Sequence, residues 1–221
     1  MPAMRGGRTG AEVSDTTKAA AGLEATGYVP TRRLEALTDA VFAFAMTLLV
    51  LNIELPESFD PKTTRDFLHG LAGLGDTFIA YLITFLVLIA FWSGRAQASY
   101  APEMASKSYT QATLFHLLWV TVLPFSMLAV SRYNVAGAVW LYGANMILLA
   151  VTGLLISRAT KRDSGREVAS TDAHDGSIEF GLLIASAILS MLVSLWSPSY
   201  AMLAYLLNIA APFVRRRTTG T

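Results

Sequence analysis

The side chains that could do chemistry in this chain are ionisable residues inside or beside long apolar runs. Arg33, Glu35 and Asp39 lie near the start of the first run, and Asp76 lies in the second. Ionisable groups at membrane depth are costly and usually belong to an ion path or a polar network. Arg33 and Asp39 are six residues apart, which places them on different faces of a helix. We therefore expect each to find partners on neighbouring helices.

A search for enzymatic constellations finds none. The three histidines, His69, His116 and His174, lie in different segments and have no paired spacing for a metal ion. The chain has no cysteine, and it lacks the motifs of serine hydrolases, zinc peptidases and phosphate-binding loops. His116 alone lies at membrane depth, inside the third apolar run, where a packing role or a proton-sensing role is possible. The sequence predicts no enzyme, no cofactor and no fixed metal site.

The composition indicates a membrane protein. Of 221 residues, 53% are apolar and only 15% are charged, and the mean hydropathy is +0.47. Soluble domains have about 45–50% apolar and about 25% charged residues. Six spans of about 20 residues would use about 120 apolar residues, close to what this chain has. A net charge of +1 gives no general electrostatic case for nucleic acid.

The apolar residues fall into six runs, each interpreted as a membrane-spanning helix. The expected bounds are 34–55, 68–92, 112–130, 135–156, 178–196 and 198–214. The fold class is therefore all-α and integral to the membrane, with one domain over residues 31–214. We expect a disordered cytoplasmic tail at 1–30 and a basic cytoplasmic tail at 215–221.

The positions of the basic residues predict the orientation. With six spans and a cytoplasmic N-terminus, only three of the 17 lysines and arginines lie outside, namely Lys62, Arg65 and Arg132. Basic residues are concentrated on the cytoplasmic side of membrane proteins. The sequence therefore predicts a multi-pass protein of the cell (inner) membrane with both termini in the cytoplasm.

The first apolar run contains a stripe of large side chains. Leu37, Val41, Phe44, Leu48 and Leu51 recur at alternating spacings of four and three, which is one face of a helix. Small residues on the other faces would allow neighbouring helices to approach closely. In a span that is apolar throughout, the stripe alone fits ordinary packing or lipid contact as well as it fits a pore.

Residues 33–56, RLEALTDAVFAFAMTLLVLNIELP, resemble the first-helix signature of a known channel family. This family contains the bacterial relatives of the endolysosomal potassium channel known as transmembrane protein 175. Its signature is an arginine, three variable residues, Phe-Ser-Asp, and a helix that ends in Thr-Leu-Leu-Val-Leu. Arg33, Leu37, Thr38 and Asp39 occupy the matching positions, with Leu37 in place of phenylalanine and Thr38 in place of serine.

The resemblance extends more weakly over most of residues 31–214. It continues at Phe91-Trp92, Leu123-Pro124-Phe125 and Ser197-Pro198-Ser199. Family members usually carry histidines soon after the Phe-Trp pair, whereas this chain has Arg95 and Ala96 there. A role of that region in tying helices together is therefore not expected to carry over.

The resemblance implies a potassium-selective or weakly selective cation channel built as a homotetramer within membrane lipid. The first helix of each subunit would line the pore, and rings of apolar side chains would constrict it. The matching ring positions are Phe44, Leu48 and Leu51, where Phe44 replaces the usual aliphatic residue. Thr47 would lie close to the constriction and support selectivity. Potassium would pass in transit, without a fixed cluster of ligands.

Two polar positions complete the expected site. Asn52, one turn above Thr47, could line the outer mouth of the pore. By resemblance, Arg33, Thr38 and Asp39 form a structural and gating network at the inner end of the first helix. The alternatives left open are a proton-permeable pathway or secondary cation transporter, and a non-conducting membrane scaffold.

Overall fold

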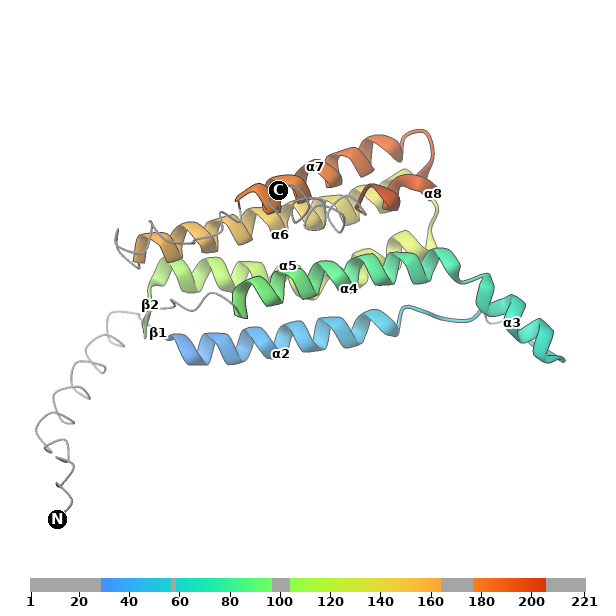
Figure 1. Cartoon of the computed structure of the whole chain (residues 1–221), viewed down its shortest axis with the longest axis horizontal. Helices are drawn as coiled ribbons and strands as arrows, with labels where there is room; N and C mark the ends of the chain where they lie inside the picture. The colour runs from blue at the N-terminus through green and yellow to red at the C-terminus, as the bar shows by residue number, and fades with distance from the viewer. Residues whose placement is uncertain (1–28, 57–58, 97–103, 164–176, 206–221) are drawn as a thin grey trace, which may run out of the picture.

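The computed structural model describes residues 29–56, 59–96, 104–163 and 177–205, which form an elongated bundle of helices (Figure 1). The expectations for the N-terminal tail up to residue 28, for residues 206–214 of the sixth span and for the tail at 215–221 lie outside the described residues. The long helices run up and down the long axis of the bundle, as short connections between apolar helices require.

Helix α2 (Thr31–Val50) forms the first span and begins directly after a short strand, β1 (Val29–Pro30). β1 pairs antiparallel with β2 (Met104–Ala105), so the start of α2 lies beside the segment that leads into the third span. The predicted helix 34–55 is shifted toward the N-terminus. It stops at Val50 because the chain turns at Leu51 and then runs extended toward Pro56, which disfavours helix in the residue before it.

The second predicted span, 68–92, is divided into two helices. Helix α3 (Thr64–Ala72) is exposed, and its N-terminus has a capping box between Thr63 and Asp66. Helix α4 (Gly75–Ala96) is the membrane-length helix. The break falls between them at Gly73 and Leu74, where glycines weaken the helix. The predicted span is therefore corrected to α4, and α3 projects beyond the bundle (Figure 1).

Helices α5 (Lys107–Arg132) and α6 (Ala136–Asp163) are longer than the predicted runs 112–130 and 135–156. α5 begins early because the Ser106 hydroxyl accepts a hydrogen bond from the Tyr109 amide and caps the helix. α6 extends seven residues into the segment expected to be a loop, and its last turn carries Lys161 and Arg162. Basic side chains favour a helix C-terminus.

Helix α7 (Ser177–Val193) corresponds to the fifth predicted span, 178–196. The helix ends three residues before the predicted end of that span. The chain then turns through Trp196 and enters α8 (Pro198–Ala201) with proline at the first helical position. A 3₁₀ turn, η2 (Met202–Tyr205), follows. These residues are the described part of the sixth predicted span.

One apolar core joins the long helices. Its largest fully buried side chains come from α2, α4, α5, α6 and η2 and include Phe42, Leu88, Leu123, Tyr142 and Tyr205. A smaller cluster closes the end of the bundle that carries β1 and β2, with Leu34, Tyr109 and Ile156. The first span is therefore fixed to the bundle along its whole length by one buried face.

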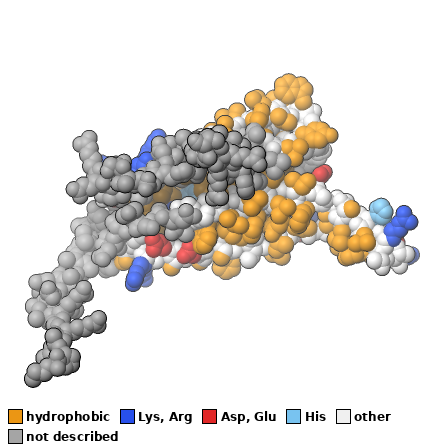
Figure 2. Space-filling view, viewed as in Figure 1, with side chains coloured by type: hydrophobic (Ala, Val, Ile, Leu, Met, Phe, Trp, Pro, Cys, Tyr) orange, Lys and Arg blue, Asp and Glu red, His pale blue; other side chains and the backbone are white. Residues whose placement is uncertain are grey.

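The surface divides into an apolar middle and charged ends. Figure 2 shows hydrophobic side chains over the middle of the visible face, with charged side chains gathered toward the ends. Three helices of the described chain, α4, α5 and α6, are long and apolar enough to cross a membrane. α2 is apolar only beyond Asp39, because Arg32, Arg33 and Glu35 precede it. The molecule has the surface of a multi-pass membrane protein.

Candidate functional site: the exposed face of the first helix

Helix α2 is packed on one face and open on another. Its buried face carries Leu34, Thr38, Phe42, Ala45 and Leu49, all at helical spacing and all in contact with the bundle. The predicted ring residues lie off this face. Phe44 is 71% exposed, Leu51 66% and Leu48 46%. On the described part of a single chain, the three predicted ring residues are therefore left open at the surface.

Thr47 lies on the open side of α2 and is exposed. Its hydroxyl donates a hydrogen bond to the backbone carbonyl oxygen of Phe44, 2.8 Å away. This bond satisfies the hydroxyl proton within the helix and leaves the lone pairs of the oxygen free on the open side. Thr47 therefore presents an acceptor between the levels of Phe44 and Leu51.

The inner polar residues of α2 do not contact one another. Asp39 accepts a hydrogen bond from the indole nitrogen of Trp92 on α4, at 3.0 Å. Thr38 is buried, and its hydroxyl donates to the Leu34 carbonyl of its own helix at 2.8 Å. Arg33 is exposed on the surface of the bundle. The partner of Asp39, 53 residues away in the sequence, is a contact that spacing alone could not reveal.

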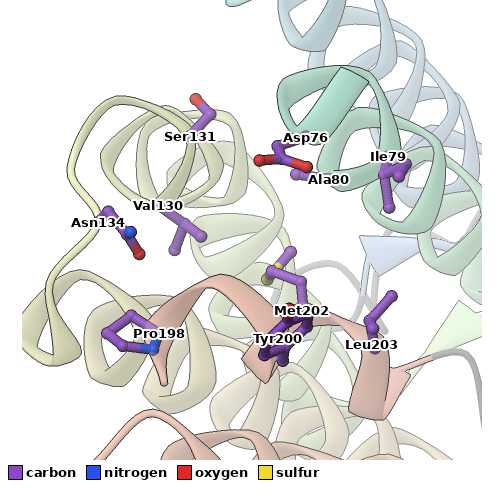
Figure 3. Close-up of a pocket in the computed structure, with 10 residues that line it drawn as sticks. All are labelled: Asp76, Ile79, Ala80, Val130, Ser131, Asn134, Pro198, Tyr200, Met202 and Leu203. Atoms are coloured by element: carbon purple, nitrogen blue, oxygen red, sulfur yellow. The ribbon is translucent and has the colours of Figure 1, made fainter. Parts of the chain in front are cut away.

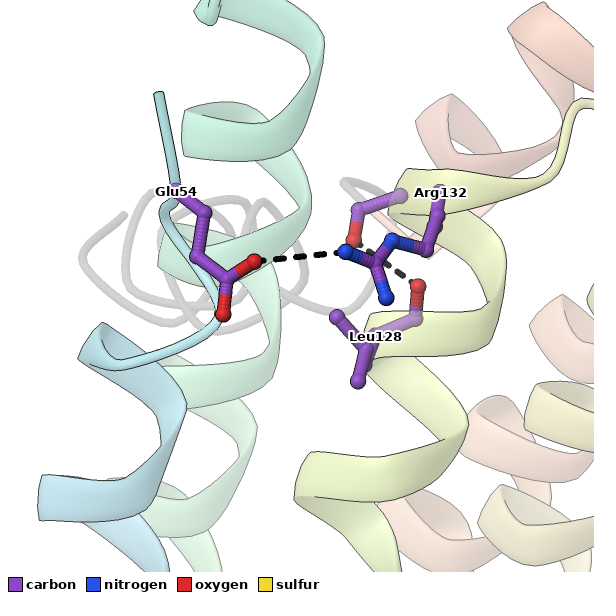
Figure 4. Close-up of polar contacts among 4 residues, drawn as sticks. Glu54, Leu128 and Arg132 are labelled. Carbon is purple, nitrogen blue, oxygen red and sulfur yellow. Dashed lines mark hydrogen bonds and ion pairs between the residues drawn. The ribbon is translucent and has the colours of Figure 1, made fainter. Parts of the chain in front are cut away.

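The residues that follow the C-terminal end of α2 are fixed to α5 by polar contacts. The Asn52 amide donates to the Pro124 carbonyl at 2.8 Å and lies 3.5 Å from the Met127 sulfur. Two residues later, Glu54 pairs with Arg132 at 3.3 Å (Figure 4). Sequence reasoning identified Asn52 as a pore-mouth residue and did not anticipate its contact with α5.

A hollow of about 450 Å³ opens at the same end of the bundle, between α4, the end of α5 and α8 (Figure 3). Asp76 and Tyr200 provide polar groups at its edge, while Ile79, Val130 and Met202 provide apolar walls. It is separate from the open face of α2. The sequence had identified Asp76 only as an ionisable residue of the second span.

His116 is enclosed by the bundle and is therefore remote from the open face of α2. It is 1% exposed, and its Nδ1 lies 2.9 Å from the Thr152 hydroxyl oxygen. Because Thr152 donates its own proton to the Leu148 carbonyl, it accepts from His116 Nδ1–H. Phe42 and Phe91 lie against the ring. In the described part of the chain, no three His, Asp or Glu residues are grouped to hold a metal ion.

Comparisons with known proteins bear on the whole of this arrangement. Residues 33–124 match the model of the family described as the endosomal/lysosomal potassium channel TMEM175. A potassium channel of Chryseobacterium sp. strain P1-3 is 23% identical over 176 residues, which are 79% of this chain and 88% of that protein. A potassium channel of Streptomyces collinus is 29% identical over 126 residues, 54% of this chain and 59% of its own length.

Two solved structures share the fold. The lysosomal potassium-selective channel TMEM175 homolog from Chamaesiphon minutus superposes with a TM-score of 0.63 at 23% identity, covering 81% of this chain and 94% of the other. The potassium channel MtTMEM175, solved with a nanobody fusion, gives a TM-score of 0.53 at 19% identity, covering 85% and 92%. By sequence this chain is similar to the TMEM175 potassium channels, and it shares their fold, in agreement with the resemblance of its first span.

Proposed function

We propose that this protein is a passive, potassium-preferring cation channel in which four copies surround a pore lined by α2. The observation that carries the proposal is the open face of α2, where Phe44, Leu48 and Leu51 are exposed although the opposite face is fully packed. A helix that lined a shared axis would need such a face. The names of its relatives as potassium channels support the choice of ion.

In this assembly, successive rings of apolar side chains would constrict the pore. Spacings of four and three residues place Phe44, Leu48 and Leu51 at successive heights along about two turns of helix. A narrow apolar ring blocks ions by excluding water, and conduction begins when it widens or hydrates. Four phenyl groups at Phe44 would make the tightest ring, and their faces could attract a partly dehydrated cation.

Thr47 would act beside these rings. Its oxygen faces the open side of α2 with free lone pairs, because its proton is bound to the Phe44 carbonyl. Such an oxygen can accept a hydrogen bond from water around a passing ion or from a neighbouring subunit. The inner residues Arg33, Thr38 and Asp39 would hold the helix rather than bind ions, and the bond from Trp92 to Asp39 supports this role.

The basic residues support an orientation with the β1 end in the cytoplasm. Seven described basic residues lie at helix ends near β1, whereas three described basic residues lie at the opposite end of the bundle. The seven are Arg32, Arg33, Arg95, Lys107, Arg158, Lys161 and Arg162. With six spans, both termini would then face the cytoplasm, and the protein would be a multi-pass component of the inner membrane.

Flux into vesicles containing the purified protein tests the proposal. Potassium flux should exceed sodium flux without saturating, and Phe44→Ala should raise the flux and reduce the preference for potassium. The matched control is Phe115→Ala, which removes a 60% exposed phenyl group from α5 and should leave both quantities unchanged.

Three results would contradict the proposal. Unchanged single-channel current and permeability ratio in Phe44→Ala would remove Phe44 from the pore. Flux that saturates with the transported ion would indicate a secondary transporter. Silence for potassium, sodium and protons, in Phe44→Ala as well as in the unmodified protein, would indicate a scaffold that conducts no ions.

A further inference from the structure

The side chain of Asn52 points toward α5, not along the open face of α2. Its amide nitrogen donates to the Pro124 carbonyl at 2.8 Å and approaches the Met127 sulfur at 3.5 Å. The residue is half-buried, whereas its neighbour Leu51 is 66% exposed. A polar side chain that directly follows α2 is therefore bound to another helix of the same subunit.

The carbonyl that Asn52 binds belongs to a proline inside a helix. Pro124 has no backbone N–H, so the Val120 carbonyl one turn earlier loses its helical donor, and the ring of the proline crowds that carbonyl. Prolines at such positions are a principal cause of helix bends. α5 therefore has a point of weakness at the height of the outer end of α2.

A second asparagine, Asn145, bonds to the turn of α5 just before Pro124. With its amide nitrogen directed at α5, Asn145 of α6 donates to the Trp119 carbonyl and accepts from the Leu123 backbone N–H, both at 3.2 Å. Asn145 is only 3% exposed. One carboxamide thus bonds to the Trp119 carbonyl and the Leu123 N–H, which are partners in the helical turn immediately before Pro124.

We propose that Asn52, which follows α2, and Asn145, on α6, are positioning residues that hold α5 near Pro124 and thereby set the position of the C-terminal half of α2. This inference rests on the proposed function, since it makes α2 the pore helix. If the angle of α5 changes at Pro124, the Pro124 carbonyl moves and the bond from Asn52 must break. The two amides then bias the equilibrium between closed and open pores, while the pore walls remain those of Phe44, Leu48 and Leu51.

The Glu54–Arg132 ion pair joins the same two elements but cannot replace the amide bond. Its side chains are 62% and 58% exposed, and exposed ion pairs contribute little because water and salt screen them. The Asn52 bond is half-buried and is made to Pro124 itself. Its loss should therefore change the gating of the pore more than the loss of the ion pair.

Recordings from single channels in planar bilayers test the inference. Asn52→Leu keeps the size of the side chain and removes the donor. It should change the open probability about threefold, the effect expected for one interhelical hydrogen bond in a membrane. The single-channel conductance and the potassium-to-sodium permeability ratio should stay at their unmodified values. Asn145→Leu should shift the open probability in the same direction.

Pro124→Ala provides a second, independent variant, because it restores the missing N–H and removes the ring that crowds the Val120 carbonyl. It should shift the open probability by itself and make it insensitive to Asn52→Leu. Elution as an assembled protein on size exclusion identifies variants that fold. If Asn145→Leu does not fold, the pair Asn52→Leu and Pro124→Ala decides the matter.

The outcomes separate this inference from the function on which it rests. Phe44→Ala in the same bilayers should change conductance whether or not Asn52 acts on the gate. A changed conductance or permeability ratio in Asn52→Leu, with unchanged open probability, would place Asn52 in the pore mouth and overturn the inference. Unchanged gating in Asn52→Leu, or additive effects of Asn52→Leu and Pro124→Ala, would also overturn it.

Discussion

Helices α2 and α6 are both apolar and both buried in part, yet they differ in how much of their surface the subunit uses. α6 is packed on two neighbouring faces, against α5 and against α7, with glycines at its closest approaches. α2 is packed on one face, where Phe42 is buried, and the equally large Phe44 is left outside. If α2 lines a shared pore, as proposed, its open face works between subunits, whereas the closely packed α6 serves as the scaffold of one subunit.

The largest effect is expected where α6 has no room for a side chain. A Cβ atom added at Gly153 would lie 2.6 Å from the Phe180 ring, so Gly153→Leu should destabilise the protein by about 1–3 kcal/mol through overpacking. Gly137→Leu is the matched control, because nothing lies within 4 Å of a Cβ atom there. Thermal unfolding in detergent measures both. Equal melting temperatures would show that α6 is not the scaffold.

A smaller loss is expected for Tyr142→Phe, also in α6. The Tyr142 hydroxyl lies 2.9 Å from the Thr84 hydroxyl, which already donates to the Ala80 carbonyl, so Tyr142 donates. Removing this buried bond should cost about 0.5–1.5 kcal/mol. Tyr133→Phe, at a position 58% exposed, should leave the melting temperature unchanged. A larger loss of stability in Tyr133→Phe than in Tyr142→Phe would contradict the expectation that packed positions contribute more to stability than open ones.

The ion pair beyond the outer end of α2 should contribute less still. Glu54→Gln removes an exposed pair and should lower stability by about 0–1 kcal/mol. Salt screens such pairs, so the difference between Glu54→Gln and the unmodified protein should shrink further in about 1 M salt. A difference that persists in high salt would mean that Glu54 acts through packing rather than charge.

The smallest effect on stability is expected for Thr47→Val on the open face of α2. The lost hydroxyl is exposed and bonded only within its own helix, so the melting temperature should not change. If α2 lines the pore, the potassium-to-sodium permeability ratio should fall all the same, because an oxygen beside the rings is lost. Val50→Thr, on the same helix but off the ring face, is the control and should leave the ratio unchanged. A lower melting temperature with an unchanged ratio would place Thr47 in the scaffold.

Much of the helical organisation can be predicted from the apolar runs, because burial and membrane contact both require them. The core of each long helix from α2 to α7 lies within or beside a predicted run. The division of the second run could not be predicted by hydropathy, since the leucines around Gly73 keep it apolar across the break. The early end of α2 likewise depends on the turn at Leu51, which hydropathy does not detect.

The candidate site divides in the same way. The stripe of Phe44, Leu48 and Leu51 follows from helical periodicity, and its exposure agrees with that pattern. The partners of Asp39 and Asn52 do not follow from periodicity, because the residues that they bond lie 53 and 72 positions away in the sequence. Spacing can place a side chain on a face of its own helix, but which neighbour covers that face depends on the packing of the whole bundle.

The tight connection between α5 and α6 bears on how the chain enters the bilayer during synthesis. Only Tyr133, Asn134 and Val135 separate the two helices, so both can leave the translocon as one hairpin. Asn145 and Ser126, one from each helix, lie 3.2 Å apart. A lone carboxamide resists transfer into hydrocarbon, whereas one that already has a hydrogen-bonding partner is accepted more easily. The short connection thus allows the hairpin to enter the lipid with its two polar side chains already bonded to each other.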